Sequence, residues 1–181
     1  MKFIVITLFP EMFESVLSCS ILKRAQEKGS IDVEFVNLRD FGLGKRKQVD
    51  DTPYGGGAGM VLRVDVMAEA IATVKKAYPK VKVTLLTPQG VLYSQDFARK
   101  FSKEKELILI CGHYEGFDER IRNLVDQELS IGQYILTGGE LAAAIVIDSV
   151  ARLVPGTLGR DESFKEESFT VQNQIEYPQY T

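Results

Sequence analysis

The sequence of 181 residues has no tryptophan, one histidine and two cysteines, and each scarcity limits the chemistry available to it. A single histidine, His113, cannot build a histidine cluster for zinc, and we interpret it as a structural or peripheral residue. The cysteines, Cys19 and Cys111, are far apart in the sequence, and each has apolar neighbours. We therefore predict two free core thiols in a reducing compartment, without a disulfide or metal site.

Long hydrophobic runs are also missing. No segment has the roughly 18 consecutive apolar residues that a membrane span requires. The apolar residues 3–8 are too few for a signal peptide, and Pro10 and Glu11 follow at once. We interpret this start as a buried strand of a cytoplasmic protein.

The sequence carries little excess charge, with a net charge of −3 and a pI near 5.3. Non-specific binding to nucleic acid usually requires a basic surface, so this balance argues against it. Short basic clusters at residues 45–47, 75–76 and 99–105 are interpreted as solvated faces. Any RNA binding must therefore be local or supplied from outside this chain.

Apolar strands alternate with amphipathic helices along the chain. The predicted strands are residues 3–8, 31–36, 81–86 and 107–111, and the predicted helices are residues 13–25, 64–78, 94–101 and 140–153. This alternation indicates an α/β fold, a parallel sheet with helices on both faces. Residues 37–63 form a loop long enough to be functional or disordered, and residues 156–174 are expected to be a flexible linker.

Three glycine-bearing segments fall at the carboxyl ends of the predicted strands, where parallel sheets bind ligands. They are a predicted turn at residues 87–90, residues 112–120 and residues 130–140. The backbone of residues 130–140 could read the edge of an adenine, although a plain strand-to-helix turn explains that segment equally well on its own. Glu115 is a candidate contact to a hydroxyl, an amine or a metal.

The densest glycine segment is Tyr54-Gly55-Gly56-Gly57-Ala58-Gly59-Met60. Glycines let the backbone approach a flat or anionic ligand closely. No Gly-Lys-Ser/Thr follows, so the segment is not a phosphate-binding P-loop. A mobile surface loop is an equally good interpretation of these residues alone.

Six segments, taken together and in order, are specific. They are Leu8 to Phe13, Val49 to Met60, Pro88-Gln89-Gly90, Cys111 to Arg120, Ser130 to Leu141 and Asp148 to Gly156. Together they closely resemble the bacterial tRNA (guanine-N1)-methyltransferases of the SPOUT superfamily, and the resemblance covers essentially the whole chain.

The resemblance implies a deep trefoil knot, which general topology rules would not predict. It also implies S-adenosylmethionine as methyl donor and a homodimer whose active sites use both subunits. The residues that it assigns to the donor are Leu85, Leu86, Pro88, Gln89, Gly112, Tyr114, Glu115, Ile131, Gly132, Gln133, Tyr134, Ile135, Leu136, Gly138 and Gly139.

The resemblance further implies tRNA as the substrate, methylated at the guanosine of position 37, next to the anticodon. The residues expected to meet this guanosine are Asp50, Pro53, Tyr54, Gly55, Gly57, Gly59 and Met60. Arg152 matches the family's catalytic arginine. Glu176 stands where the best-known members have an aspartate proposed as the general base. A magnesium requirement is also implied, with Glu115 and Glu176 as two candidate ligands.

Members of this family continue into a helical domain that grips tRNA, whereas this sequence stops at Thr181. We therefore expect a methyltransferase domain at residues 1–155, followed by a linker and the start of the next domain at residues 156–181. Such a chain should bind S-adenosylmethionine and dimerise but methylate tRNA poorly or not at all. Three alternatives are a SPOUT enzyme for another RNA position or base, a non-enzymatic binding module and an unknotted nucleotide-binding enzyme.

Overall fold

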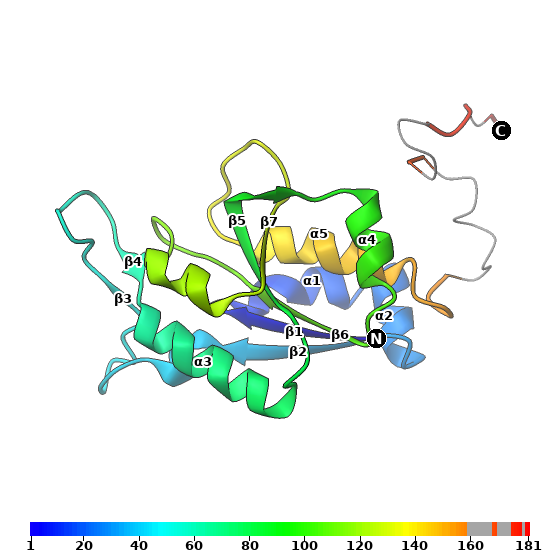
Figure 1. The fold of residues 1–181 in the computed structure, drawn as a ribbon. Coiled ribbons are helices and arrows are strands. Elements are labelled where there is room, and N and C mark those ends of the chain that lie inside the picture. The colour runs from blue at the N-terminus through cyan, green and yellow to red at the C-terminus, as the bar shows by residue number, and fades with distance from the viewer. Residues whose placement is uncertain (159–167, 170–174, 179) are drawn as a thin grey trace.

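A five-stranded parallel sheet forms the centre of the protein (Figure 1). The computed structural model describes residues 1–158, 168–169, 175–178 and 180–181. In the order β2-β1-β6-β5-β7, the strands are β2 (Asp32–Asn37), β1 (Lys2–Thr7), β6 (Glu106–Ile110), β5 (Val83–Leu92) and β7 (Gln127–Ser130). All four neighbouring pairs are parallel, so the predicted parallel α/β sheet is confirmed.

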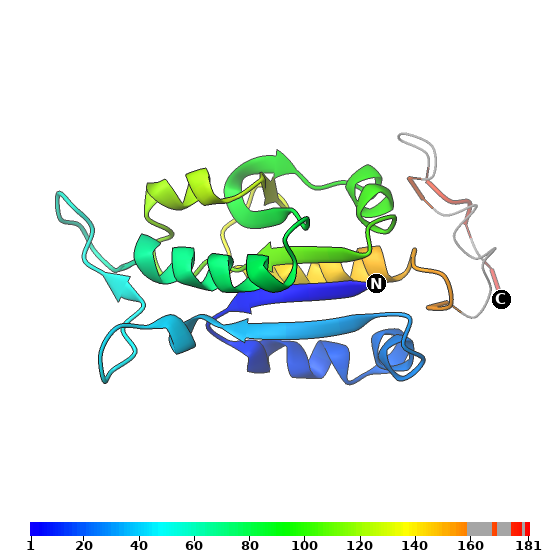
Figure 2. The same ribbon diagram turned by 60° about the horizontal axis from the view of Figure 1, so that its bottom comes forward.

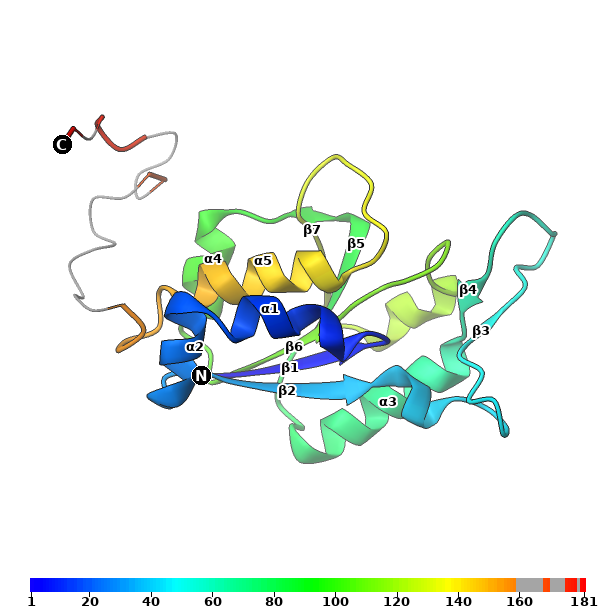
Figure 3. The ribbon, with the colours of Figure 1, turned by 180° about the vertical axis from the view of Figure 1, so that it is seen from behind.

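Helices cover both faces of this sheet (Figures 2 and 3). One face packs against α1 (Glu14–Leu17), α2 (Ser20–Glu27), α4 (Gln95–Phe101) and α5 (Glu140–Ala151). The other packs against α3 (Val64–Ala77) and the 3₁₀ helices η2 (Leu38–Phe41) and η3 (Glu119–Leu124). Among the described residues, no helix is both long and apolar enough to cross a membrane.

The central strand β1 is buried on both faces of the sheet, which explains its continuously apolar sequence. Phe3 and Val5 belong to the core on the α5 side, whereas Ile4 and Ile6 belong to the core on the α3 side. All four side chains are fully buried. Successive side chains of a strand point to opposite faces, so a strand buried on both faces needs apolar residues at every position.

The single helix predicted at residues 13–25 is wrong. The chain instead forms a 3₁₀ turn, η1 (Pro10–Phe13), and then α1 and α2, with an extended Cys19 between the two helices. The side-chain amide of Gln26 donates to the Leu17 carbonyl, 2.8 Å away, which satisfies a group that the break leaves without a helical partner. Cys111 is buried as predicted, but the break places Cys19 on the surface, and both thiols are free.

Strand β5 does not end at the predicted turn. Leu86 and Val91 both pair with Leu129 of β7, so residues 87–90 bulge out and the strand then resumes to Leu92. Strand β7 was not expected from the sequence, because it is short and Leu129 is its one apolar residue. The bulge lifts Pro88 out of the sheet at its carboxyl edge.

Much of the predicted long loop at residues 37–63 is ordered. It contains η2, a tight turn closed by a bridge between Leu43 and Gln48, and an antiparallel hairpin of β3 (Asp50–Asp51) and β4 (Val61–Leu62). We call residues 50–62 the glycine arm. Figure 1 shows it projecting from one end of the sheet. The predicted linker at residues 156–174 lies largely outside the described residues.

Candidate active site

A cavity of about 310 Å³ lies at the carboxyl edge of the sheet, beyond β5, β6 and β7. Three loops surround it: a first loop at residues 86–88, a second at residues 112–117 and a third at residues 130–139. We call it the loop cavity. These are the three segments that the sequence predicted to face one ligand, although they are far apart along the chain.

The loop cavity gathers most of the residues assigned to the methyl donor. Those that line it are Leu86, Pro88, Gly112, Tyr114, Glu115, Ile131, Gly132, Tyr134, Ile135, Leu136, Gly138 and Gly139. Three others do not line it. Leu85 points from β5 into the core on the α3 side, Gln89 borders a separate hollow, and Gln133 lies on the surface.

The third loop combines backbone polar groups with apolar side chains. The Gly139 N–H donates to the Gly112 carbonyl across 2.8 Å, which joins the third loop to the second. Ile135 is 90% exposed and Tyr134 is 53% exposed, so neither side chain is used for the core. Such a loop can offer edge contacts to a heterocycle and apolar cover for its faces.

The second loop turns sharply as it leaves β6. Tyr114 adopts a left-handed conformation with φ of 61°, which is uncommon for a residue other than glycine. The Gly116 N–H closes the turn on the His113 carbonyl at 3.2 Å. This geometry leaves Tyr114 and Glu115 exposed at the cavity, as predicted for a contact loop.

A buried polar cluster of Thr7, His113 and Glu140 lies beside the cavity. The Thr7 hydroxyl donates to Glu140 Oε1 at 2.8 Å and accepts the Phe9 N–H at 3.0 Å. Glu140 stands in the first turn of α5, where a carboxylate is favoured by the helix dipole. Burial, with the nearby Glu140, raises the pKa of the Cys111 thiol, which therefore stays protonated.

The sequence analysis missed this cluster. His113, predicted to be a structural or peripheral residue, lines the loop cavity together with Gly138 and Gly139. Two signals were available in the sequence. Thr7 is a polar residue at the end of an apolar strand, and Glu140 is an acidic residue at the start of an apolar helix.

The glycine arm is bonded to the second loop through its backbone. The Glu115 N–H donates to the Met60 carbonyl at 3.0 Å, and the Leu62 N–H donates to the Gly116 carbonyl at 2.9 Å. Gly59 has a φ of 83°, a left-handed conformation that favours glycine, and it lies against the Glu115 side chain. The arm and the loop cavity therefore share one wall.

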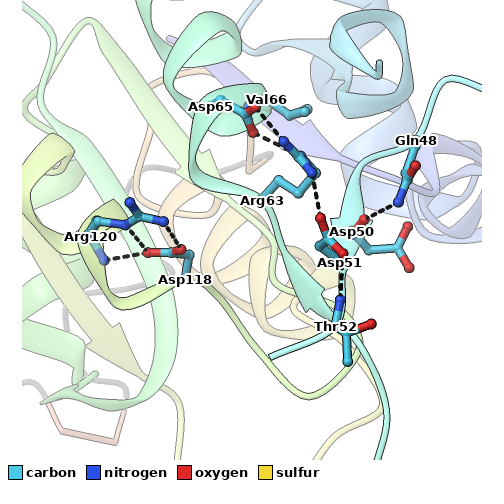
Figure 4. A network of polar contacts seen from close by, with 9 residues as sticks. All are labelled: Gln48, Asp50, Asp51, Thr52, Arg63, Asp65, Val66, Asp118 and Arg120. Carbon is cyan, nitrogen blue, oxygen red and sulfur yellow. Dashed lines mark hydrogen bonds and ion pairs between the residues drawn. The ribbon is translucent and has the colours of Figure 1, made fainter. Parts of the chain in front are cut away.

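Ion pairs fix the base of the arm, as Figure 4 shows. Arg63 donates to Asp51 across 2.6 Å and to Asp65, at the start of α3, across 2.7 Å. The hydrogen bond from Arg63 lowers the pKa of Asp65. A second pair joins Arg120 to Asp118 at 2.6 Å and lowers the pKa of the Asp118 carboxyl in the same way. Both carboxylates stay ionised near neutral pH.

The residues predicted to meet guanosine lie along the arm. Asp50 is on β3, and Pro53 and Met60 are half-buried. Tyr54 is 97% exposed, and Gly55, Gly57 and Gly59 all have positive φ. None of these residues lines the loop cavity. They form a projecting surface beside it.

The two predicted catalytic residues lie elsewhere in this chain. Arg152 follows the last turn of α5, and Gly139, which lines the cavity, precedes the first. The intervening helix of 12 residues is about 18 Å long at 1.5 Å per residue. Glu176 is exposed, and its N–H donates to the Ser168 hydroxyl at 3.0 Å. Within the described part of the chain, no group of three or more His, Cys, Asp or Glu side chains is arranged to hold a metal ion.

Comparison with known proteins places this arrangement in one family. All 181 residues match the family model described as "tRNA (Guanine-1)-methyltransferase TrmD". Two proteins named tRNA (guanine-N(1)-)-methyltransferase match over the full length of this chain. The one from Geobacillus kaustophilus (strain HTA426) is 53% identical, with 74% of its length covered. The one from Carboxydothermus hydrogenoformans (strain ATCC BAA-161 / DSM 6008 / Z-2901) is 54% identical, with 71% covered.

A solved structure agrees with these matches. The crystal structure of tRNA (m1G37) methyltransferase from Aquifex aeolicus superposes with a TM-score of 0.81 and 37% sequence identity. The match covers 98% of this chain and 80% of that one. As its six segments predicted, the chain belongs to the tRNA (guanine-1)-methyltransferase family.

Proposed function

We propose that this chain transfers a methyl group from S-adenosylmethionine to N1 of a guanosine in tRNA, at position 37 beside the anticodon. The observation that carries the proposal is the meeting of the three loops around one cavity, with the glycine arm attached to its wall. Family membership supports the reaction type. The position follows the Aquifex aeolicus protein, which is named a tRNA (m1G37) methyltransferase.

The loop cavity suits the proposed methyl donor. Its volume lies in the range of small-ligand sites, and its lining is mainly backbone and apolar side chains. In this proposal the third loop holds the adenine, with backbone groups at its edge and Ile135 and Leu136 at its faces. When bound, S-adenosylmethionine supplies a methyl group activated by a sulfonium, which departs as a neutral thioether. No general acid is therefore required.

Guanine approaches along the glycine arm in this proposal. Glu115 and Met60 connect the arm to the second loop, so a base held by the arm lies next to the donor. Holding the two reactants in line lowers the barrier mainly through orientation. RNA loops present such bases splayed out of the stack, where their edges are accessible.

The catalytic groups prepare the nucleophile. Glu176 takes the N1 proton of guanine, and Arg152 stabilises the negative charge that develops on O6. The N1 electron pair then forms the bond to the methyl carbon, while the bond from that carbon to sulfur breaks and its electron pair stays on sulfur. Glu176 is one methylene longer than the aspartate of the best-known family members, and it keeps the carboxylate that the reaction needs.

A homodimer explains how Arg152 reaches the substrate. The length of α5 separates it from the loop cavity of its own chain, so we propose that it serves the cavity of a second copy. The deep trefoil knot, a magnesium requirement and a cytoplasmic location remain parts of the same proposal. They rest on the family resemblance.

Methyl transfer to tRNA transcripts tests the proposal. Transcripts carrying guanosine at position 37 should accept labelled methyl groups, and those carrying adenosine there should not. Arg152→Ala should abolish transfer and leave S-adenosylmethionine binding unchanged by calorimetry. Transfer to the adenosine transcript, or to a guanosine elsewhere, would favour a SPOUT enzyme of another specificity. Because transfer by this chain alone is expected to be poor or absent, the same assays are run on the chain extended by the C-terminal part of its relatives. Donor binding by this extended chain without transfer to any RNA would favour a binding module.

A further inference from the structure

The cluster of Thr7, His113 and Glu140 contains a buried carboxylate that is only half satisfied. Glu140 is 2% exposed, and its Oε1 accepts the hydrogen bond from Thr7. Its Oε2 is also buried, and no described residue donates a hydrogen bond to it. A buried carboxylate oxygen without a hydrogen bond has lost its hydration without compensation, so a donor is expected nearby.

His113 has a buried ring nitrogen, Nδ1, that is also without a partner in the described part of the chain, although no hydrogen bond joins it to Glu140 in this structure. Both atoms face Gly138. A Cβ on that glycine would lie 2.8 Å from His113 Nδ1 and closer still to Glu140 Oε2. The two unpaired atoms are therefore neighbours across the space that Gly138 leaves open.

The opposite edge of the ring is different. Among the described residues, His113 Nε2 has no hydrogen-bond partner, yet it is not one of the buried unpaired atoms, so it is accessible to solvent. The residue lines the loop cavity. Phe9 packs on the ring at 4.7 Å between centroids, and Tyr114 meets it edge-on at 5.1 Å. In this orientation of the ring, Nδ1 lies on the side of Glu140 and Nε2 is accessible to solvent.

We propose that Glu140 is a positioning residue that accepts a hydrogen bond from His113 Nδ1–H. This bond leaves Nε2 to accept a hydrogen bond from an N–H or O–H group of bound S-adenosylmethionine. The proposal rests on the proposed function for the identity of the ligand.

The proton assignment follows from the partner. An ionised carboxylate can only accept, so the nitrogen that faces it must carry the proton. In the neutral ring the other nitrogen is then an acceptor. A second group that fixes the tautomer of a working imidazole is a common device in enzyme sites.

Nitrogen-15 NMR of the imidazole ring tests the first half of the proposal. His113 is the only histidine, so one pair of ring signals reports on it. The neutral ring of the full chain should carry its proton on Nδ1. Glu140→Gln should move protonation toward Nε2, because an amide N–H can then face Nδ1. Glu14→Gln, an exposed first-turn glutamate of α1, should change nothing. An Nε2–H ring, unaltered by Glu140→Gln, would overturn the proposal.

Two matched substitutions test the second half. In His113→Asn the amide nitrogen replaces Nδ1, so the bond to Glu140 survives while the cavity-facing acceptor is lost. In His113→Gln the longer amide reaches toward the Nε2 position. We expect the Asn variant to bind S-adenosylmethionine about tenfold more weakly, and the Gln variant to retain more of the affinity. Thermal unfolding monitors whether both variants fold.

Ligand analogues locate the hydrogen-bonding group. If it belongs to the adenosyl part, methylthioadenosine should lose the same factor in the Asn variant. If the hydrogen-bonding group is the amino-acid ammonium, only S-adenosylmethionine and S-adenosylhomocysteine should lose affinity for the Asn variant. The role of Nε2 is refuted if each of the three ligands binds folded wild type, the Asn variant and the Gln variant with the same affinity. Failure of wild type to bind S-adenosylmethionine would instead refute the proposed function.

Discussion

Gly138 is a residue of the loop cavity that leaves no room for a side chain. A Cβ there would lie 2.8 Å from His113 Nδ1 and 3.2 Å from the Gly112 carbonyl oxygen, and would press on Glu140. These groups belong to two bonded loops and a buried carboxylate, so they cannot move apart independently. Gly138→Ala should weaken S-adenosylmethionine binding at least about tenfold, or about 1.4 kcal/mol, by calorimetry.

The matched control is Gly44→Ala. Gly44 has a φ of 64° and open space around its Cβ position. The substitution should therefore cost stability of about 1 kcal/mol through backbone strain, without any loss of donor affinity. Equal donor affinity in both alanine variants would contradict the role assigned to Gly138.

Tyr93 gives a prediction about alkaline stability. Burial raises the pKa of Tyr93 to about 12, against a hydrogen bond with Ser149 at 2.7 Å that acts in the opposite direction. The folded state thus holds this proton more tightly than the unfolded state. The free energy of unfolding should be unaffected by this group below about pH 10 and should fall between about pH 10 and 12.

Tyr93→Phe removes this titration. The variant should lose about 1 kcal/mol at neutral pH with the hydrogen bond, but its stability should then decline less steeply above about pH 10. Urea unfolding across this pH range measures both effects. Tyr180→Phe, at a side chain that is 90% exposed, serves as the control. Parallel pH profiles for wild type and Tyr93→Phe would refute the assignment.

At the scale of elements, the glycine arm depends on Arg63 for its attachment to α3. Arg63→Met breaks the ties to Asp51 and Asp65 but keeps the length of the side chain. Exposed ion pairs are screened by solvent and contribute little, so the KM for tRNA should rise only severalfold. Donor affinity and the loop cavity should be unaffected.

Steady-state kinetics with tRNA, combined with calorimetry for the donor, measures this separation. Lys23→Met breaks an exposed ion pair with Glu27 on α2 and should leave the KM unchanged. A parallel loss of donor affinity in Arg63→Met would mean that the arm and the cavity do not act as separate parts.

Elements with uniform surroundings were predictable from sequence. Strand β1 is buried on both faces, and α3 has one apolar face, so their residue patterns are unambiguous. Strand β7 was missed because it is short and polar. The bulge in β5 was read as the end of the strand, since Pro88 and Gly90 are typical of turns. Extended Cys19 interrupts an otherwise regular helical pattern.

At the scale of the whole molecule, the position of Arg152 predicts shared active sites. Mixing Arg152→Ala subunits with Gly138→Val subunits should restore activity, because one site of each mixed dimer then has both an intact cavity and an intact arginine. Equal mixing makes half the dimers mixed, so the rate per protomer should reach about a quarter of the wild-type rate. Transfer assays after refolding the mixture measure this recovery. No recovery in a mixture shown to contain mixed dimers would place Arg152 and the cavity in the same chain.

The residue pattern predicted which loops meet, whereas only the family resemblance implied that the active sites use both subunits. Residues at the carboxyl ends of parallel strands converge by topology alone, which brings Pro88, Gly112 and Gly138 together. Leu85 was assigned to the same site because no pattern shows which face of a doubly buried strand a residue occupies. The separation of Arg152 from the cavity follows from the length of α5, and its consequence appears only when a second copy is considered.

The backbone bonds between Met60 and Glu115 and between Leu62 and Gly116 have a thermodynamic consequence. A methyl donor that orders the second loop therefore also restricts the glycine arm, which is proposed to receive the RNA. Affinities for the methyl donor and for RNA should then be linked, each raising the other by the same factor, as reciprocity requires. Cooperativity between the two substrates would then arise from these two backbone hydrogen bonds, without any change of fold.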